Sequence, residues 1–450
     1  MITLEPLELS ELSFSLLVAN IPEYLCKRWR EDPAIIRIAK ENSTEDIVKE
    51  ILGMVGSAEL DFGETVRLYA LLVSLSLKDP NSPFPKEIKT LKIKWFPEIV
   101  DFMERRRFVT SEAPVVSTPA KKRALITGIS GQDAGWLAEL LLSKDYEVFG
   151  LKRRTSNGSL CRVEHLLDRI RIIEGDMTDA FSLSAAVRQS RPDEIYNLAA
   201  QSFVKVSFQQ PEMTGNITGL GVTRLLEAVK TCAPKAKMFH CSTSEMFGLT
   251  PPPQNENSPF HPRSPYGCAK MYAYWMTVNY RESYGMFVSN GIMFNHASRK
   301  RGPEFVSQKI AQGVASIHHG FSKTLELGNL EAKRDWGHAK DVVEAMWLVL
   351  QQDKPDDFVI GTGEAHSVRD FCQLAFQRVG LDYEKHVVIN PEFYRPAEVD
   401  YLLADASKAR RVLGWVPKVK FQDLVNEMVD WAVDHPEEWM PKTPSGKVSP

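Results

Sequence analysis

The sequence predicts an α/β fold: a doubly wound parallel sheet with a smaller C-terminal lobe, preceded by a small, mostly α-helical domain. Three observations predict it. Short apolar strands alternate with helices from about residue 121 onward, a glycine-rich turn joins the first strand to the first helix, and the pattern becomes mixed after residue 300. Strands that are apolar on both faces and separated by helices are typical of a parallel sheet covered by helices on each side.

The first 107 residues have a helical pattern. Ser43 and the acids that follow it form a helix start before an apolar repeat. A later stripe keeps helical spacing through Leu68, Leu71, Leu72 and Leu75. Residues 109–123 are rich in Ser, Thr and Pro, as linkers are. We therefore place a helical domain of unknown role at 1–107, a linker at 108–120 and an α/β domain at 121–440.

The α/β domain begins with six candidate strands, at residues 124–128, 147–152, 170–175, 194–200, 237–243 and 287–294. Helical segments such as GWLAELLLS and LGVTRLLEAVKT separate them. This alternation is the pattern of a Rossmann-like sheet. Three further helices, near 305–318, 339–351 and 367–379, are expected in the smaller lobe, which would close over the carboxyl edge of the sheet.

Composition excludes several classes of protein. The chain is 43% hydrophobic and 25% charged, which is typical of a soluble globular protein, and its net charge of -3 argues against a nucleic-acid binder. No apolar run reaches the roughly 18 residues that span a bilayer. The first twelve residues carry acids where a secretion signal needs basic residues. The six cysteines form no CxxC pair and the histidines no metal-ligand spacing, so we expect reduced thiols, no metal and a cytoplasmic location.

A glycine-rich turn follows the first strand. Gly128 permits a tight turn, Gly131 lets the backbone approach a pyrophosphate, and the helix that follows offers free N–H groups. Ala134 stands where a third glycine is usual. Glycine turns follow many strands, but this one lies between the first strand and the first helix of an alternating series. It therefore predicts a dinucleotide site.

The end of the second strand indicates which dinucleotide binds. An NAD site usually has an acid here, whereas this strand ends in Lys152-Arg153-Arg154-Thr155-Ser156. An arginine fork can hold a 2′-phosphate with two hydrogen bonds. We predict NADP; the alternative is a solvated basic turn.

Two more strand ends complete the predicted cofactor site. Asp176 follows the third strand and would reach the adenine end. The segment 198–202 follows the fourth strand, and its small alanines would leave room for the ribose and nicotinamide. Packing alone would explain those alanines equally well.

Tyr266 and Lys270 are four residues apart, so on a helix they share one face. Ser264 and Pro265 mark the start of that helix. The ammonium group would lower the pKa of the tyrosine, which could then take a proton from a sugar hydroxyl. A Tyr-x-x-x-Lys spacing is expected about once by chance in a chain of this length, so its weight depends on its partners.

The strongest partner is the segment Ser242-Thr243-Ser244-Glu245, at the end of the fifth strand. Substrates lie at this edge of a parallel sheet. The hydroxyl of Thr243 can bond the reacting oxygen, and the carboxylate of Glu245 can move a second proton. The alternative is a Ser/Thr turn with a solvated glutamate.

Together with these residues, the sequence from about 123 to 435 resembles the GDP-mannose 4,6-dehydratases of the extended short-chain dehydrogenase/reductase group. The resemblance rests on long strings: GISGQDAGWLAELLL, YNLAAQSFVKVSF, STSEMFG, PFHPRSPYGCAK, NGIMFNHAS, LGNLEAKRDWGHAKDVVEAMW and RPAEVDYL. It implies tightly bound NADP, GDP-mannose as substrate and GDP-4-keto-6-deoxy-mannose as product. We also expect a homo-oligomer, either a dimer or a tetramer.

The resemblance assigns roles by motif. It implies catalytic roles for Thr243, Glu245, Tyr266 and Lys270. The implied cofactor contacts, which include Tyr266 and Lys270, are Gly128, Ile129, Ser130, Gly131, Gln132, Asp133, Arg153, Arg154, Thr155, Ser156, Asp176, Met177, Leu198, Ala199, Ala200, Gln201, Ser202, His296 and Arg301. The implied substrate contacts are Ser244, Asn295, Lys309, Arg334, Arg395 and Glu398.

Two departures accompany the resemblance. The family usually has NHESPxRG where this chain has NHASRKRG, so the loop at 296–302 could pack differently against the cofactor or a neighbouring subunit. Ala134 and Gly135 replace the usual Gly-Ser. Residues 1–107 have no counterpart in the family pattern, and the pattern does not indicate a partner for them.

The rival functions are a nucleotide-sugar epimerase or 4-reductase, neither of which needs Glu245 for elimination. A rival from another class is an interaction protein, in which a retired enzyme domain is carried by a helical docking module. Intact Thr243, Glu245, Tyr266 and Lys270 argue against that retirement.

Overall fold

The computed structural model describes residues 121–155 and 160–440. The helical domain predicted at 1–107, the linker at 108–120 and Ser156 therefore lie outside the described residues. Within the described part, no helix is long and apolar enough to cross a membrane.

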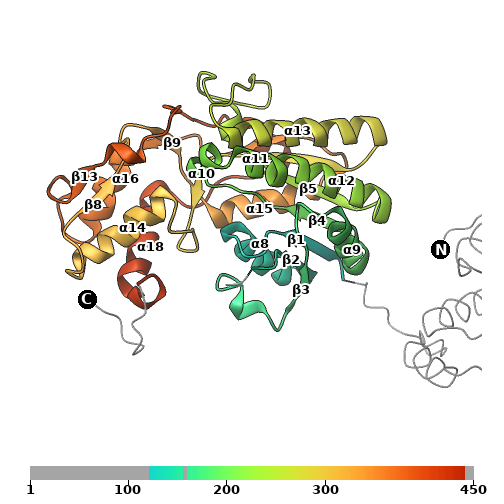
Figure 1. Cartoon of the computed structure of the whole chain (residues 1–450), viewed down its shortest axis with the longest axis horizontal. Helices are drawn as coiled ribbons and strands as arrows, with labels where there is room; N and C mark the ends of the chain where they lie inside the picture. The colour runs from blue at the N-terminus through green and yellow to red at the C-terminus, as the bar shows by residue number, and fades with distance from the viewer. Residues whose placement is uncertain (1–120, 156–159, 441–450) are drawn as a thin grey trace, which may run out of the picture. The chain divides into compact units, whose positions relative to one another are not determined.

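The centre of the domain is a seven-stranded parallel sheet, which confirms the predicted fold class (Figure 1). Its order is β11-β6-β5-β4-β1-β2-β3. Six of the strands lie where they were expected: β1 (Arg123–Thr127), β2 (Glu147–Lys152), β3 (Ile170–Glu174), β4 (Glu194–Asn197), β5 (Lys237–Thr243) and β6 (Val288–Met293).

The fourth strand is shorter than predicted. It ends at Asn197 rather than at residue 200, because the N–H groups of Leu198 and Ala199 both donate to the Thr127 hydroxyl at 3.1 Å. A side chain of β1 therefore turns the segment after β4 out of the sheet. The seventh strand, β11 (Phe358–Ile360), was not predicted because three residues give too short a pattern.

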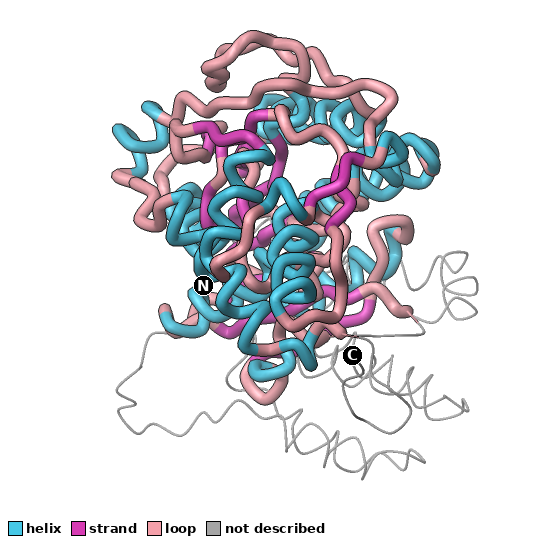
Figure 2. Tube along the Cα trace, turned by 90° about the vertical axis from the view of Figure 1, so that its left-hand side faces the viewer, coloured by secondary structure: helices cyan, strands magenta, loops and turns pink. Residues whose placement is uncertain are grey.

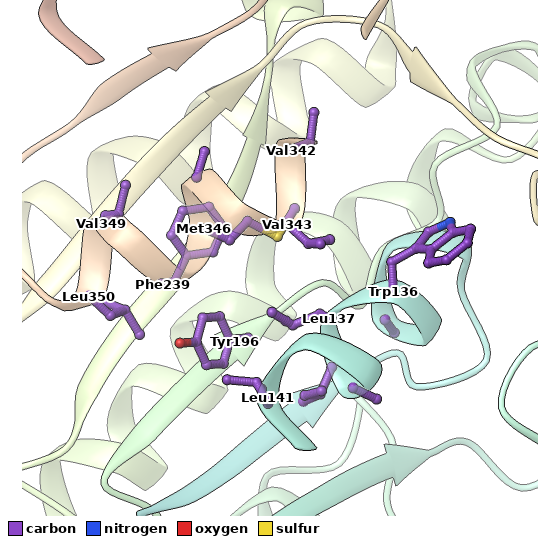
Figure 3. Packing of buried hydrophobic residues seen from close by; sticks show 14 of the residues in the cluster. Trp136, Leu137, Leu141, Tyr196, Phe239, Val342, Val343, Met346, Val349 and Leu350 are labelled. Atoms are coloured by element: carbon purple, nitrogen blue, oxygen red, sulfur yellow. The ribbon is translucent and has the colours of Figure 1, made fainter. Parts of the chain in front are cut away.

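Helices cover both faces of the sheet. On one face, α8 (Gln132–Ser143) and α15 (Ala339–Leu350) pack on β4 and β5. Figure 3 shows Leu137, Leu141 and Met346 around Tyr196 and Phe239. On the other face, a separate buried cluster joins β1 and β5 to three helices, which are α9 (Ala180–Ser190), α12 (Gly221–Cys232) and α13 (Pro265–Tyr284). Figure 2 shows the strands inside this helical shell.

The smaller lobe has its own buried cluster, which confirms the predicted second part of the fold. The three predicted helices are present as α14 (Val306–His318), α15 and α16 (Val368–Arg378), although α15 packs on the sheet. The structure adds elements that were not predicted. Helix α17 (Ser407–Leu413) packs on the sheet beside α15. The others are α18 (Phe421–Asp434) and the paired strands β7 (His296–Ala297), β8 (Leu325–Leu327), β9 (Lys333–Asp335), β10 (Gly337–His338), β12 (Ala365–Ser367) and β13 (Val387–Ile389).

The remaining helical elements are short and connect the larger ones: α10 (Val204–Gln209), α11 (Pro211–Thr214), the π-helical η2 (Gly215–Leu220) and the turns η1 (Glu164–Leu166), η3 (Ser244–Met246), η4 (Tyr383–Lys385), η5 (Pro391–Phe393) and η6 (Pro436–Glu438). The strand order reverses between β1 and β4. In such sheets, ligands bind beyond the carboxyl ends of the strands at this point.

Candidate active site

A pocket of about 440 Å³ lies beyond the carboxyl ends of β1, β4 and β5, between the sheet and the smaller lobe. Segments that are far apart in the sequence line it together. Most of the predicted site residues are among them: Gly128, Gly131, Gln132, Asp133, Leu198, Ala200, Ser202, Thr243, Ser244, Glu245, Tyr266, Lys270, Asn295, His296, Arg301, Lys309, Arg334, Arg395 and Glu398.

Several predicted cofactor residues lie outside this lining. Ile129 and Met177 are buried in the hydrophobic clusters of the sheet. Arg153, Arg154 and Thr155 are exposed on the segment after β2. The others that do not line the pocket are Ser130, Asp176, Ala199 and Gln201. Their predicted roles stay predictions.

The glycine turn has the shape that a dinucleotide needs. Gly128 has a φ of 71°, and a Cβ atom there would lie 2.9 Å from the Cα of Ala199. Only glycine fits so close to the neighbouring strand end. Gly131 is the N-cap of α8 and makes no side-chain cap hydrogen bond. The first N–H groups of α8 therefore face the pocket with a positive dipole end, which suits a phosphate.

Asp133 and His296 form a largely buried pair directly after the glycine turn. His296 Nε2 lies 2.9 Å from the carboxylate, and its Nδ1 lies 2.8 Å from the carbonyl oxygen of Phe294. Burial raises the pKa of Asp133, but the charge and hydrogen bond of His296 and the amide of Gln132 outweigh it, so that the pKa falls to about 2. The pair joins α8 to the segment after β6.

Tyr266 and Lys270 lie one turn apart on α13, as predicted. The Ser264 hydroxyl caps this helix by accepting the N–H of Gly267 at 3.0 Å. Lys270 is buried, and its Nζ donates to the carbonyl oxygen of Cys241 at 2.6 Å. This bond fixes the lysine between α13 and the end of β5.

The predicted lowering of the Tyr266 pKa is wrong: the pKa of Tyr266 is raised above its ordinary value. Burial raises the pKa of Tyr266, and the opposing effects come from a hydrogen bond with Thr243 and the charge of Arg301. Burial also lowers the pKa of Lys270. Desolvation therefore outweighs the attraction that the sequence argument considered.

Glu245 belongs to a chain of alternating charges. Its Oε1 lies 3.6 Å from Arg395 Nη1, which lies 3.8 Å from Glu398; Glu398 in turn lies 3.6 Å from Arg334 Nη2. Arg334 is only 6% exposed, and burial lowers its pKa. Two arginines thus face the pocket beside the carboxylate, where they suit a diphosphate.

The pocket residues that sequence reasoning missed include Arg162, Lys205 and Phe393. Lys309 Nζ lies 3.5 Å from the centre of the Phe393 ring, and Lys205 Nζ donates to the carbonyl oxygen of Glu392 at 2.9 Å. For Arg162 and Lys205, positive charge was the only signal in the sequence, and it does not distinguish them from solvated lysines and arginines. Their positions depend on how the lobe meets the sheet.

Comparison with known proteins gives one consistent result. The sequence model of a family described as GDP-mannose 4,6 dehydratase matches residues 125–428. A GDP-mannose 4,6 dehydratase of Drosophila melanogaster is 48% identical over 347 residues, which cover 71% of this chain and 88% of that protein. GDP-mannose 4,6 dehydratase 2 of Arabidopsis thaliana is 51% identical over 322 residues, with coverages of 69% and 86%.

Solved structures with the same fold include two nucleotide-sugar enzymes. A dTDP-glucose 4,6-dehydratase from Streptomyces venezuelae, solved with NAD and TYD bound, superimposes with a TM-score of 0.64 at 26% identity, covering 70% of this chain and 98% of that one. A UDP-glucose 4-epimerase from Thermus thermophilus, solved with NAD, gives 0.61 at 27% identity, with coverages of 69% and 98%.

Proposed function

The chain belongs to the GDP-mannose 4,6-dehydratase family, and we propose that it converts GDP-mannose to GDP-4-keto-6-deoxy-mannose with loss of water. One observation carries the proposal: Thr243, Glu245, Tyr266 and Lys270 line one pocket beside two arginines. A retired enzyme domain would not be expected to keep all four groups together.

The cofactor of the family is a nicotinamide dinucleotide, and we propose NADP for this chain. The free helix N-terminus of α8 would bind its pyrophosphate, and Arg153 and Arg154 would bind its 2′-phosphate. When bound, the nicotinamide would accept a hydride from C4 of the sugar and return it to C6. The reaction therefore consumes no cofactor.

Oxidation at C4 requires a base for the hydroxyl proton. Tyr266 is buried at the pocket, where the Thr243 hydroxyl favours its ionised form, so it would receive the proton once ionised. Lys270, held on the Cys241 carbonyl, supplies the neighbouring cation that favours the phenolate. The ketone formed at C4 makes the C5 hydrogen acidic.

Elimination requires a second base, and Glu245 is the carboxylate beside Tyr266 in the pocket. Glu245 would take the C5 proton, and the C6 oxygen would leave as water with a proton from Glu245 or Thr243. The backbone N–H of Glu245 donates to the Thr243 hydroxyl at 3.2 Å, so the two groups are held together. A proton then returns to C5 as C6 is reduced.

The diphosphate of the substrate would lie against Arg334 and Arg395, with Lys309 and Asn295 nearby. Glu398 could accept a hydrogen bond from a ribose hydroxyl or a guanine donor. With the diphosphate held there, the sugar would lie toward Tyr266 and Glu245.

The alternative is an epimerase or 4-reductase of the same fold, since the fold itself is shared with a UDP-glucose 4-epimerase. Such enzymes do not need Glu245. Mass spectrometry of the products formed from GDP-, dTDP- and UDP-hexoses distinguishes the two: the proposal expects loss of water from GDP-mannose, and a product of unchanged or hydrogenated mass would contradict it.

We propose in addition that the protein is a cytoplasmic homo-oligomer. Helix α13 exposes Tyr272, Trp275 and Tyr284, which a second copy could cover. Residues 1–107 would form a separate helical module for assembly or for an unknown partner. The mass of the protein in solution tests the proposed homo-oligomer, and the mass of a monomer would contradict it.

A further inference from the structure

At the rim of the cofactor pocket, the side chains of Arg162 and Lys300 each contact the backbone carbonyl oxygen of the other residue. Arg162 Nε donates to the carbonyl oxygen of Lys300 at 2.6 Å, and Lys300 Nζ lies 3.4 Å from the carbonyl oxygen of Arg162. The two residues are 138 positions apart: Arg162 follows β2, and Lys300 follows β6. We call this reciprocal pair the Arg162–Lys300 clasp.

The clasp is anchored on both sides. Lys300 Nζ pairs with Glu139 of α8 at 2.6 Å and lies 4.3 Å from the centre of the Trp136 ring; its side chain is only 11% exposed. Arg162 Nη1 donates to the carbonyl oxygen of Ser130, within the glycine turn, at 3.0 Å. The clasp therefore joins three segments around the start of α8.

Gly135 of α8 lies against the clasp. A Cβ atom on Gly135 would lie 2.9 Å from the Arg162 carbonyl oxygen and 3.4 Å from Lys300 Nζ, so serine would crowd both residues. Glycine at position 135 therefore leaves room for the contact between Arg162 and Lys300.

We propose that the Arg162–Lys300 clasp retains the dinucleotide in the pocket between turnovers. Arg162, Gly131 and Arg301 line the same pocket, so the segments that the clasp joins are the walls past which a dinucleotide would leave. The inference rests on the proposed function, in which the cofactor is regenerated at each turnover and has no need to dissociate. Nothing in that mechanism requires either side chain for chemistry.

The test measures how fast bound dinucleotide is lost from the full-length protein. Parent, Arg162→Ala, Lys300→Ala and the double variant are dialysed, and the remaining NADP is released by heat and measured by chromatography. Arg169→Ala is the matched control, because within the described residues the Arg169 side chain makes no hydrogen bond or ion pair. Arg162→Lys, which keeps the charge but cannot reach both carbonyl oxygens, replaces Arg162→Ala if that variant does not fold.

We expect each single variant to lose NADP roughly tenfold faster than the parent, because hydrogen bonds to charged groups are lost. The double variant should lose it no faster than the single ones, since both changes break the same contact. If the variants retain NADP as long as the parent does, the proposed role of the clasp is wrong, even if their melting temperature falls. A parent protein that retains no NADP would also overturn the proposal. Product analysis with GDP-mannose in the same samples tests the proposed function separately.

Discussion

Lys270 Nζ donates to the carbonyl oxygen of Cys241 at 2.6 Å and lies 5.9 Å from the centre of the Tyr266 ring. The cation that is nearest to Tyr266 on its own helix is therefore tied to the end of β5. Of the groups that lower the pKa of the buried Tyr266 phenol, the Thr243 hydroxyl has the largest effect.

Replacing Thr243 by valine should make the enzyme depend more steeply on pH. Because burial already raises the pKa of Tyr266, loss of the Thr243 hydrogen bond raises it further, and the limb of the kcat profile that rises with pH should move to higher pH. At neutral pH kcat should fall roughly 5–10-fold, the effect of one hydrogen bond. If the profiles of the variant and the parent superimpose, Thr243 does not assist Tyr266.

The arginines after β2 should determine the choice of cofactor. Changing Arg153 and Arg154 together to alanine removes the proposed contacts to a 2′-phosphate, so the variant should lose its preference for NADP over NAD. Calorimetric titration of protein stripped of dinucleotide measures both affinities. Equal affinity of the parent for NAD and NADP would refute the assignment.

Asp133 should contribute to stability in a defined range of pH. Its pKa lies at about 2 in the folded protein and at 3.8 ordinarily, so the stabilisation is present above pH 3.8 and is lost as pH falls toward about 2. Asp133→Asn should lower the free energy of unfolding by about 2 kcal/mol at neutral pH, and the difference should shrink in acid.

Chemical denaturation at several pH values measures this difference. Asp353→Asn is the control, because Asp353 is exposed and its side chain has no partner within 160–440. A difference between Asp133→Asn and the parent that stays constant down to acid pH would mean that the pair with His296 does not hold the carboxylate.

Much of the fold could be predicted because its signals are local. Apolar runs bounded by turns located six strands, and Ser264 with Pro265 located the start of α13. The small strands of the lobe and β11 have two or three residues each, which is too short for periodicity to appear. Their pairing depends on contacts between distant segments.

The candidate site, too, could be predicted from the sequence only in part. Motifs brought Thr243, Glu245 and Tyr266 to one pocket, since strand ends of a parallel sheet meet at one edge. The raised pKa of Tyr266 could not be predicted, because it follows from burial in the folded protein. The partners of Arg162 were hidden for a related reason: both are backbone carbonyls, which leave no mark in a sequence.

The boundary of the catalytic domain should lie before Lys122. Lys122 Nζ pairs with the buried carboxylate of Glu194 at 3.0 Å, and the N–H of Arg123 donates to Asp193 at 2.8 Å. A chain that starts at residue 118 should stay soluble and active, whereas one that starts at residue 124 should lose about 1–3 kcal/mol of stability. Thermal melting and product assays compare the two.

The truncation also tests the role of residues 1–107. If the chain that starts at residue 118 is soluble but inactive, the first part helps to form the site and is not an independent module. Insoluble protein would instead indicate that the first part covers an apolar face.

The most direct test of the proposed mechanism is the Glu245→Gln variant, mixed with GDP-mannose while the reduced-nicotinamide absorbance is followed. Oxidation at C4 needs Tyr266 and should survive, but glutamine cannot take the C5 proton, so turnover should fall by about 10²–10⁴-fold. We expect bound NADPH to accumulate together with a 4-keto hexose that keeps its C6 oxygen, and we expect Tyr266→Phe to form neither. If Glu245→Gln forms product at the parent rate, Glu245 is not the base that drives the loss of water, and the proposed mechanism is wrong.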